Sequence, residues 1–308
     1  MDSFFAHEET HMALTDKQLE QFQDRGLVVA ENVLTDADLD PVIDVMSDFV
    51  DRQGEKLQKE GKITNLYQEE TFLTRYAHLF AQSAEIGKGM DIYELLAKPI
   101  FDFLRNDNLL DAVESILGPD ITCSPIQHIR AKPPSRLDDS PSYNVPWHQD
   151  SGVSWADSDQ TLALTCWIPL VDATVERGCL EVIPGVNHTG HLDHISDGGT
   201  RIRTDLMPQT KSEPAEVPKG GVAFLSQYTP HRSVPNLTSW DVRWSLDLRY
   251  VAYGEPTGRP FFPDFCVRSH NHPERILVDH EVWRENWVAA MEKQTLNPKQ
   301  AHRISEKK

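Results

Sequence analysis

The sequence predicts a single α+β domain in which helices come first and a mainly β core follows. Apolar residues recur at helical spacing up to about residue 118, whereas short alternating runs separated by Gly, Pro, Asn and Asp fill about 120–252. The second pattern is typical of an antiparallel sandwich or barrel. No internal repeat or low-complexity linker divides the 308 residues. We therefore expect one domain over 1–308, with a helical part at about 14–118 and a C-terminal extension at 253–308.

The helical part is predicted to follow a loose tail at residues 1–13. A first helix begins at Thr15, whose capping-box partner is Gln18, and ends at Gly26. Residues 27–30 then form a short strand.

A second helix opens at Thr35, and its apolar residues recur through Val50. The polar residues 51–64 either extend this helix or loop out from it. Two or three further amphipathic pieces lie between residues 76 and 117.

The β core is predicted from apolar and alternating runs bounded by turn residues. These runs place strands at 121–132, 161–170, 180–183, 222–225 and 242–251. Two long polar segments separate some of them. Residues 133–144 are expected to form a loop, and residues 187–217 to form a functional lid or a disordered segment. A helix is expected from about Asp279, and its Trp283 and Trp287 side chains are expected to pack it against the rest of the protein.

Charge and composition narrow the class of partner and the compartment. The net charge of −18 repels phosphate-rich partners, so nucleic acid is not expected, and a cationic or neutral small molecule suits the protein better than an anion. No apolar run is long enough to cross a membrane, and the first 12 residues do not read as a secretory signal, so a cytoplasmic location is expected. The 4 cysteines show no metal or disulfide spacing and are expected to be reduced. The oligomeric state stays open.

The segment Trp147-His148-Gln149-Asp150 carries a possible metal site. On an extended strand, side chains two residues apart share a face, so His148 and Asp150 can reach one ion. His231 is the best candidate for a third ligand. Two imidazoles and one carboxylate with open positions are the ligand set of non-heme Fe(II) oxygenases. A purely structural role for these residues is the alternative.

A second group of polar residues lies on the strand predicted at 242–251. Arg243 and Ser245 share one face, where a guanidinium and a hydroxyl can together hold a carboxylate. Arg249 on the same face is expected to pair with Asp247.

Several segments together resemble the phytanoyl-CoA dioxygenase family of Fe(II)/2-oxoglutarate-dependent oxygenases. They are Leu14 to Leu39, Trp147 to Asp150, Ala163 to Trp167, Gly178 to His188, His231, and Arg243-Trp244-Ser245. The resemblance implies a double-stranded β-helix (a jelly roll, cupin-like) flanked by N-terminal and C-terminal helices. It also implies that His148, Asp150 and His231 bind Fe(II).

The resemblance further implies a pocket for 2-oxoglutarate. Arg243, helped by Ser233, would hold the distal carboxylate, and Trp167 and His128 would line the pocket. Ser245 and Thr165 are added to the expected pocket residues because strand alternation places their side chains on the polar face of each strand.

Hydroxylation of a small molecule with release of succinate and CO2 is the expected reaction, with O2 as oxidant and ascorbate as a reductant. Desaturation, epimerisation or ring formation on the same core, a non-catalytic metal-binding or sensing protein, and a zinc hydrolase are the alternatives. His188, His191 and His194 are expected to be solvated in a polar loop rather than to bind a second metal, and Trp147 and Trp244 to lie in the core.

Overall fold

The structure is a computed structural model that describes residues 13–300 and 302–304. The tail predicted at 1–13 lies outside this range except for its last residue. The first helix, α1 (Asp16–Arg25), is confirmed with its capping box at Thr15 and a left-handed Gly26 after it. The polar residues after Val50 extend the second helix, so α2 spans Asp36–Lys59.

More short helices follow α2 than the sequence predicts. They are α3 (Arg75–Gln82), α4 (Ile92–Leu95), α5 (Lys98–Phe103) and α6 (Asp107–Leu117). Helix α7 (His280–Leu296) begins after Asp279, as predicted, and buries Trp283 and Trp287. No helix in the described part of the chain is long and apolar enough to cross a membrane.

Within the described residues, a seven-stranded sheet forms the centre of the fold. Its order is β1 (Leu27–Ala30), β9 (Val222–Ser226), β4 (Leu164–Pro169), β11 (Arg243–Ala252), β2 (Asp120–Cys123) and β12 (Phe265–Ser269), and β3 (His128–Lys132) also pairs with β11. All of these pairings are antiparallel.

The strand predicted at 121–132 is wrong as a single element. It divides into β2 and β3, which pair with opposite ends of β11. The ladder is interrupted after Ser124, whose N–H still donates to the carbonyl of Arg249 at 2.9 Å, because Pro125 has no N–H to donate. The Gln127 side chain instead bonds the carbonyl of Ser124 at 2.7 Å.

The segment 187–217 is not disordered, so that alternative is wrong. It contains β6 (His194–Ser196), β7 (Thr200–Ile202) and β8 (Glu213–Ala215). Strands β6 and β7 form a hairpin, and β8 joins β5 (Leu180–Val182) and β10 (His231–Ser233) in a small sheet of order β10-β5-β8.

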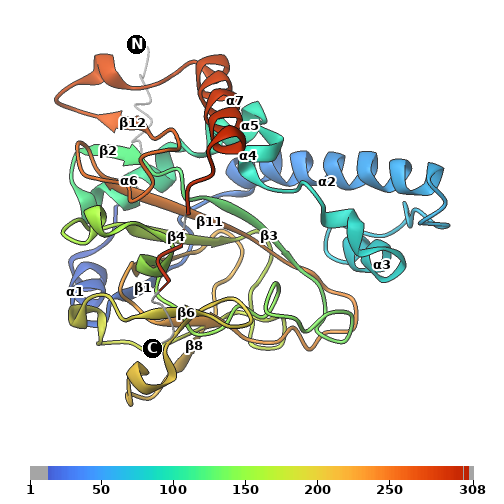
Figure 1. The fold of residues 1–308 in the computed structure, drawn as a ribbon, viewed down its shortest axis with the longest axis horizontal. Coiled ribbons are helices and arrows are strands. Elements are labelled where there is room, and N and C mark those ends of the chain that lie inside the picture. The colour runs from blue at the N-terminus through green and yellow to red at the C-terminus, as the bar shows by residue number, and fades with distance from the viewer. Residues whose placement is uncertain (1–12, 301, 305–308) are drawn as a thin grey trace, which may run out of the picture.

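The two faces of the large sheet are covered differently. Helices α2, α4, α5 and α7 lie on one side, and β6 and β8 lie on the other (Figure 1). Alternate residues of β4 follow this division: Cys166 packs into the helical core, and Trp167 packs with the small sheet. The predicted alternation of this strand is therefore confirmed, and the polar side chains of β4 and β11 face the space between the sheets.

Candidate functional site

The structure brings the three predicted metal ligands together where the small sheet begins. His148 and His231 form an antiparallel bridge, in which each backbone N–H donates to the other residue's carbonyl at 3.0 and 2.9 Å. Asp150 starts a short 3-10 turn, so the segment is a bridge followed by a turn and not an extended strand. One side-chain donor atom from each of the three residues lies within 4.8 Å of the others.

Backbone carbonyls set the tautomers of both imidazoles. Nδ1 of His148 is 2.9 Å from the carbonyl of Pro146, and Nδ1 of His231 is 2.9 Å from that of Thr229. A carbonyl only accepts, so each Nδ1 carries the proton and each Nε2 keeps a free lone pair. This arrangement fits a metal centre, since metal-bound histidines commonly use the other ring nitrogen in this way. Burial, and then His231, lower the pKa of His148 to about 3, so the ring stays neutral.

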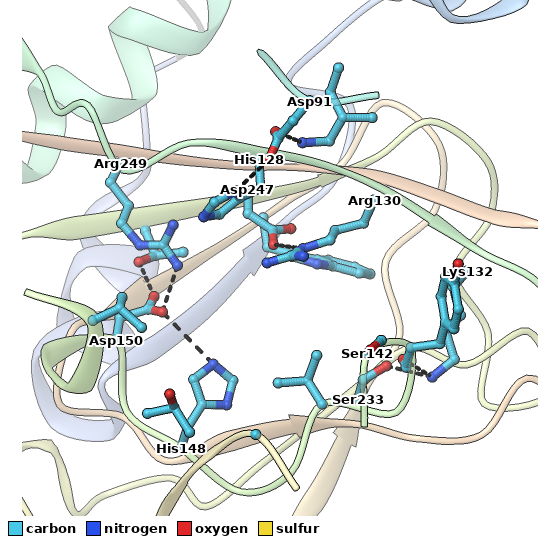
Figure 2. Close-up of a pocket in the computed structure, with 18 of the residues that line it drawn as sticks. Asp91, His128, Arg130, Lys132, Ser142, His148, Asp150, Ser233, Asp247 and Arg249 are labelled. Carbon is cyan, nitrogen blue, oxygen red and sulfur yellow. Dashed lines mark hydrogen bonds and ion pairs between the residues drawn. The ribbon is translucent and has the colours of Figure 1, made fainter. Parts of the chain in front are cut away.

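Asp150 is buried and held by two donors. Arg249 donates to Oδ1 at 2.6 Å, and the hydroxyl of Thr165 donates to Oδ2. Burial alone would raise the pKa of Asp150, but Arg249 and the two histidines hold it well below its usual value. Figure 2 shows Arg249 and His148 both directed at this carboxylate.

The ion pair predicted between Arg249 and Asp247 is wrong. Arg249 pairs with Asp150, and Asp247 accepts from Arg130 at 3.2 Å. The partner of Arg249 is 99 residues away in the chain, so local alternation could not identify it.

Two buried cations converge on the hydroxyl of Ser233. Nη2 of Arg243 lies 3.3 Å from Oγ of Ser233. Nζ of Lys132 lies 2.6 Å from the same oxygen (Figure 2). The other hydrogen-bond partners of Arg243 are the carbonyl of Gly178 and the hydroxyl of Ser245. No carboxylate in the described part of the chain is within ion-pair distance of either cation, which suits the site to an anionic ligand.

Burial affects the charge of both cations. Burial, and then Arg243, lower the pKa of Lys132 to about 6, and burial lowers that of Arg243 to about 10. Sequence reasoning missed Lys132 as a site residue because it placed the residue only as the end of the strand predicted at 121–132.

The other predicted pocket residues take different positions. Trp167 lines the cavity, with the guanidinium of Arg243 5.2 Å from its ring centroid. His128 also lines it and bonds Asp91 at 2.9 Å. Thr165 is at the cavity but bonds Asp150, and Ser245 lies behind Arg243 and is not among the cavity-lining residues that the structure describes.

Gln149 and His194 form hydrogen bonds that connect the loops around the predicted metal ligands. The Gln149 side chain donates to the carbonyls of Gly190 and Tyr228, and its backbone N–H donates to Nε2 of His194 at 3.0 Å. His194 is fully buried, so the expectation that it is solvated is wrong. Its burial follows from the β6–β7 hairpin, which the composition did not predict.

One cavity of about 640 Å³ lies between the two sheets. The metal-ligand trio and the Arg243–Lys132 pair both line it. The cavity can therefore hold a metal ion, a small dicarboxylate that reaches from the ion to Arg243, and a further small molecule.

Comparisons with known proteins agree with this geometry. The sequence profile of the phytanoyl-CoA dioxygenase (PhyH) family matches residues 22–243. The phytanoyl-CoA dioxygenase domain-containing protein 1 of Danio rerio is 24% identical over 258 residues, which cover 72% of this chain and 85% of the relative. A methylphosphonate hydroxylase of Gimesia maris is 36% identical over 92 residues, which cover 30% of this chain and 34% of the relative.

Two solved structures share the fold. The non-heme monooxygenase ThoJ in its apo form matches with a TM-score of 0.64 at 20% identity, over 91% of this chain and 96% of that one. The non-heme alpha ketoglutarate dependent epimerase SnoN from nogalamycin biosynthesis matches with a TM-score of 0.50 at 18% identity, over 80% of this chain and 86% of that one.

Proposed function

The chain belongs to the phytanoyl-CoA dioxygenase family and is thus a 2-oxoglutarate-dependent oxidoreductase, and we propose that it hydroxylates a small molecule with O2, releasing succinate and CO2. One observation carries the proposal. The trio of His148, Asp150 and His231 opens into the same cavity as Arg243, a buried cation with no carboxylate partner among the described residues.

The trio would hold the iron. The Nε2 atoms of its two histidines and the ionised carboxylate of Asp150 would supply two nitrogen ligands and one oxygen ligand to Fe(II), which would leave coordination positions for other ligands. Bound iron together with 2-oxoglutarate supplies the oxidation. Arg249 and Thr165 keep the carboxylate ionised and oriented in the absence of metal.

Arg243 and Lys132 would hold the distal carboxylate of 2-oxoglutarate, with Ser233 between them. Trp167 would flank the cosubstrate, since its ring already packs beside the Arg243 guanidinium. Ser245 would position Arg243 without touching the cosubstrate. Walls from both sheets exclude water, so these charges act in a weakly screened space.

The large and small sheets are proposed to be the two sheets of a double-stranded β-helix, in one domain over 1–308. The cavity lies between them, and the trio lies where β10 meets the bridge to His148. Desaturation, epimerisation and ring formation would use the same binding residues and differ only in the product. Ascorbate is proposed only as a reductant that keeps the iron ferrous.

Succinate formation tests the proposal. Purified protein is given Fe(II), ascorbate, 2-oxoglutarate and O2, and succinate is measured with and without candidate substrates. We expect slow uncoupled succinate formation, faster formation with a true substrate, and a product that has gained one oxygen atom.

The matched pair of variants is Arg243→Gln, which should lose the reaction at low 2-oxoglutarate, and Arg284→Gln, which removes an exposed cation paired with Glu281. No succinate from iron-loaded wild type would overturn the assignment and favour a hydrolytic or binding role. A product that gains no oxygen would overturn hydroxylation alone.

A further inference from the structure

Arg259 is a buried cation in the same cavity that the proposed chemistry does not use. Only 7% of its surface is exposed, and it lines the cavity. Its Nε donates to the carbonyl of Val153 at 3.0 Å, and neither terminal nitrogen has a hydrogen-bond partner among the described residues. Val153 ends the turn that Asp150 begins, so Arg259 is attached directly to the turn that carries a proposed iron ligand.

Charges inside the cavity leave Arg259 without an acidic partner. Each lining carboxylate is already engaged, in the pairs Asp91–His128, Asp150–Arg249 and Asp247–Arg130. In the described part of the chain, no carboxylate lies within ion-pair distance of Arg259. A guanidinium held in this way lacks the counter-charge that a buried cation normally has.

Other polar groups surround the same part of the cavity. Arg259, His128 and His302 all line the cavity, and burial and then the first two side chains lower the pKa of His302. The Nδ1 of His302 is 2.6 Å from the hydroxyl of Thr200, so the end of the chain is tied to the β6–β7 hairpin at the cavity.

An apolar wall stands beside these polar groups. The rings of Tyr93 and Phe262 pack on Trp287 with centroids 5.9 and 5.3 Å away, and all three line the cavity with Met291. Aromatic faces of this kind bind the body of a small organic molecule.

We propose that Arg259 binds an oxyanion group of the substrate, a carboxylate, phosphonate or phosphate, while the wall of Tyr93, Phe262 and Trp287 packs against the substrate's apolar body. This inference rests on the proposed function, and it names the class of substrate for that site. The anion would be held on the Asp150 side of the cavity, apart from the Arg243–Lys132 pair that receives 2-oxoglutarate. The net charge of the whole protein favours a cationic or neutral substrate, but the buried Arg259, which has no acidic partner among the described residues, favours an organic anion.

Binding measurements test this proposal with probes of matched shape. The protein is loaded with Fe(II) and saturating 2-oxoglutarate under anaerobic conditions, so that the Arg243 site is filled. Phenylacetate, benzylphosphonate and the neutral phenylacetamide are then titrated by calorimetry. We expect at least one of the two anions to bind about 10-fold or more tightly than the amide, as one charge-assisted hydrogen bond implies. The order of the two anions identifies the preferred oxyanion.

Variants test whether Arg259 causes the preference for the anion. Arg259→Gln should abolish the preference for the anion, Arg259→Lys should keep part of it, and Arg284→Gln, which removes a cation outside the cavity, should keep all of it. If Arg259→Gln does not fold, the proposal is still tested by two results: the preference of wild type for the anions over the amide, and the partial loss of that preference in Arg259→Lys.

Several outcomes would overturn the role of Arg259. They are an amide that binds as tightly as both anions, an anion preference that survives in Arg259→Gln, and a loss of 2-oxoglutarate affinity in that variant. Retention of Fe(II) and 2-oxoglutarate is measured first. Failure of the wild type at that step counts against the iron and cosubstrate assignment. A wild type that retains both ligands but binds neither anion more tightly than the amide counts only against Arg259.

Discussion

Binding of 2-oxoglutarate should take up a proton, because Lys132 lies beside the proposed position of the distal carboxylate. In the free protein, burial and then Arg243 lower the pKa of Lys132 to about 6. Three acceptors surround its Nζ, namely the carbonyl of Tyr143, the side-chain oxygen of Asn144 and the hydroxyl of Ser233. A carboxylate added at Ser233 supplies the missing negative charge and raises the pKa of the amine.

The size of the effect follows from the pKa. At pH 8, two units above the pKa of about 6, roughly 1% of Lys132 carries its proton in the free protein. Since the protonated form binds the anion, complex formation at pH 8 should take up about one proton. The dissociation constant of 2-oxoglutarate should then rise nearly 10-fold per pH unit above pH 6. His148, whose pKa is about 3, is already neutral there and adds nothing.

Calorimetry in buffers of different ionisation enthalpy measures the proton directly. Anaerobic Fe(II)-loaded protein is titrated with 2-oxoglutarate at pH 8 in phosphate and in Tris. The slope of the observed enthalpy against the buffer ionisation enthalpy gives the number of protons taken up. We expect a value near one for wild type and near zero for Lys132→Met. A slope near zero for wild type, or an unchanged slope in Lys132→Met, would refute this placement of the carboxylate.

Three further predictions concern the same site. Asp150→Ala or His148→Ala should abolish retention of iron after desalting, measured by metal analysis, and wild-type retention would remove the ligand assignment. Arg243→Gln should weaken 2-oxoglutarate binding by about 100-fold and leave iron retention unchanged, because removing one partner of a buried charge pair costs about 3 kcal/mol of binding free energy. Arg249→Met should lower the free energy of unfolding of the metal-free protein by about 3–5 kcal/mol in urea, because it leaves the Asp150 carboxylate buried without its cation.

Stability against pH gives an independent check on Lys132. Burial lowers the pKa of Lys132 from the usual 10.5 of a lysine to about 6, so between these pH values the unfolded chain holds a proton that the native protein lacks. The contribution of this group to the free energy of unfolding therefore increases as pH rises from 6 to 10.5. Lys132→Met should remove this slope in the metal-free protein, and an identical slope in the variant would contradict the shifted pKa.

Local signals predicted the parts of the fold that depend on neighbouring residues. Thr15 with Gln18 and Gly26 specified both ends of α1. Alternation in β4 specified which of its residues face the helices and which face the cavity. The break between β2 and β3 was missed because Pro125 was not weighed as a break within 121–132, although the two strands pair with opposite ends of β11.

The site was predictable where residue types and order carry the signal. His148, Asp150, His231 and Arg243 were found in this way, and the structure places all four at one cavity. Contacts between distant segments gave no such signal. The pairing of Arg249 with Asp150 spans 99 residues, and side-chain spacing on one strand cannot reveal it. Arg259 lies beyond the last predicted strand, so only the folded chain brings it to the turn at Val153.

A crystal structure grown anaerobically with Fe(II) and 2-oxoglutarate tests the central claim most directly. Anomalous scattering at the iron edge should give a single strong peak between Nε2 of His148, the Asp150 carboxylate and Nε2 of His231. Density for 2-oxoglutarate should run from that peak to Arg243. A peak elsewhere, or a cosubstrate whose distal carboxylate lies away from Arg243, would contradict the account.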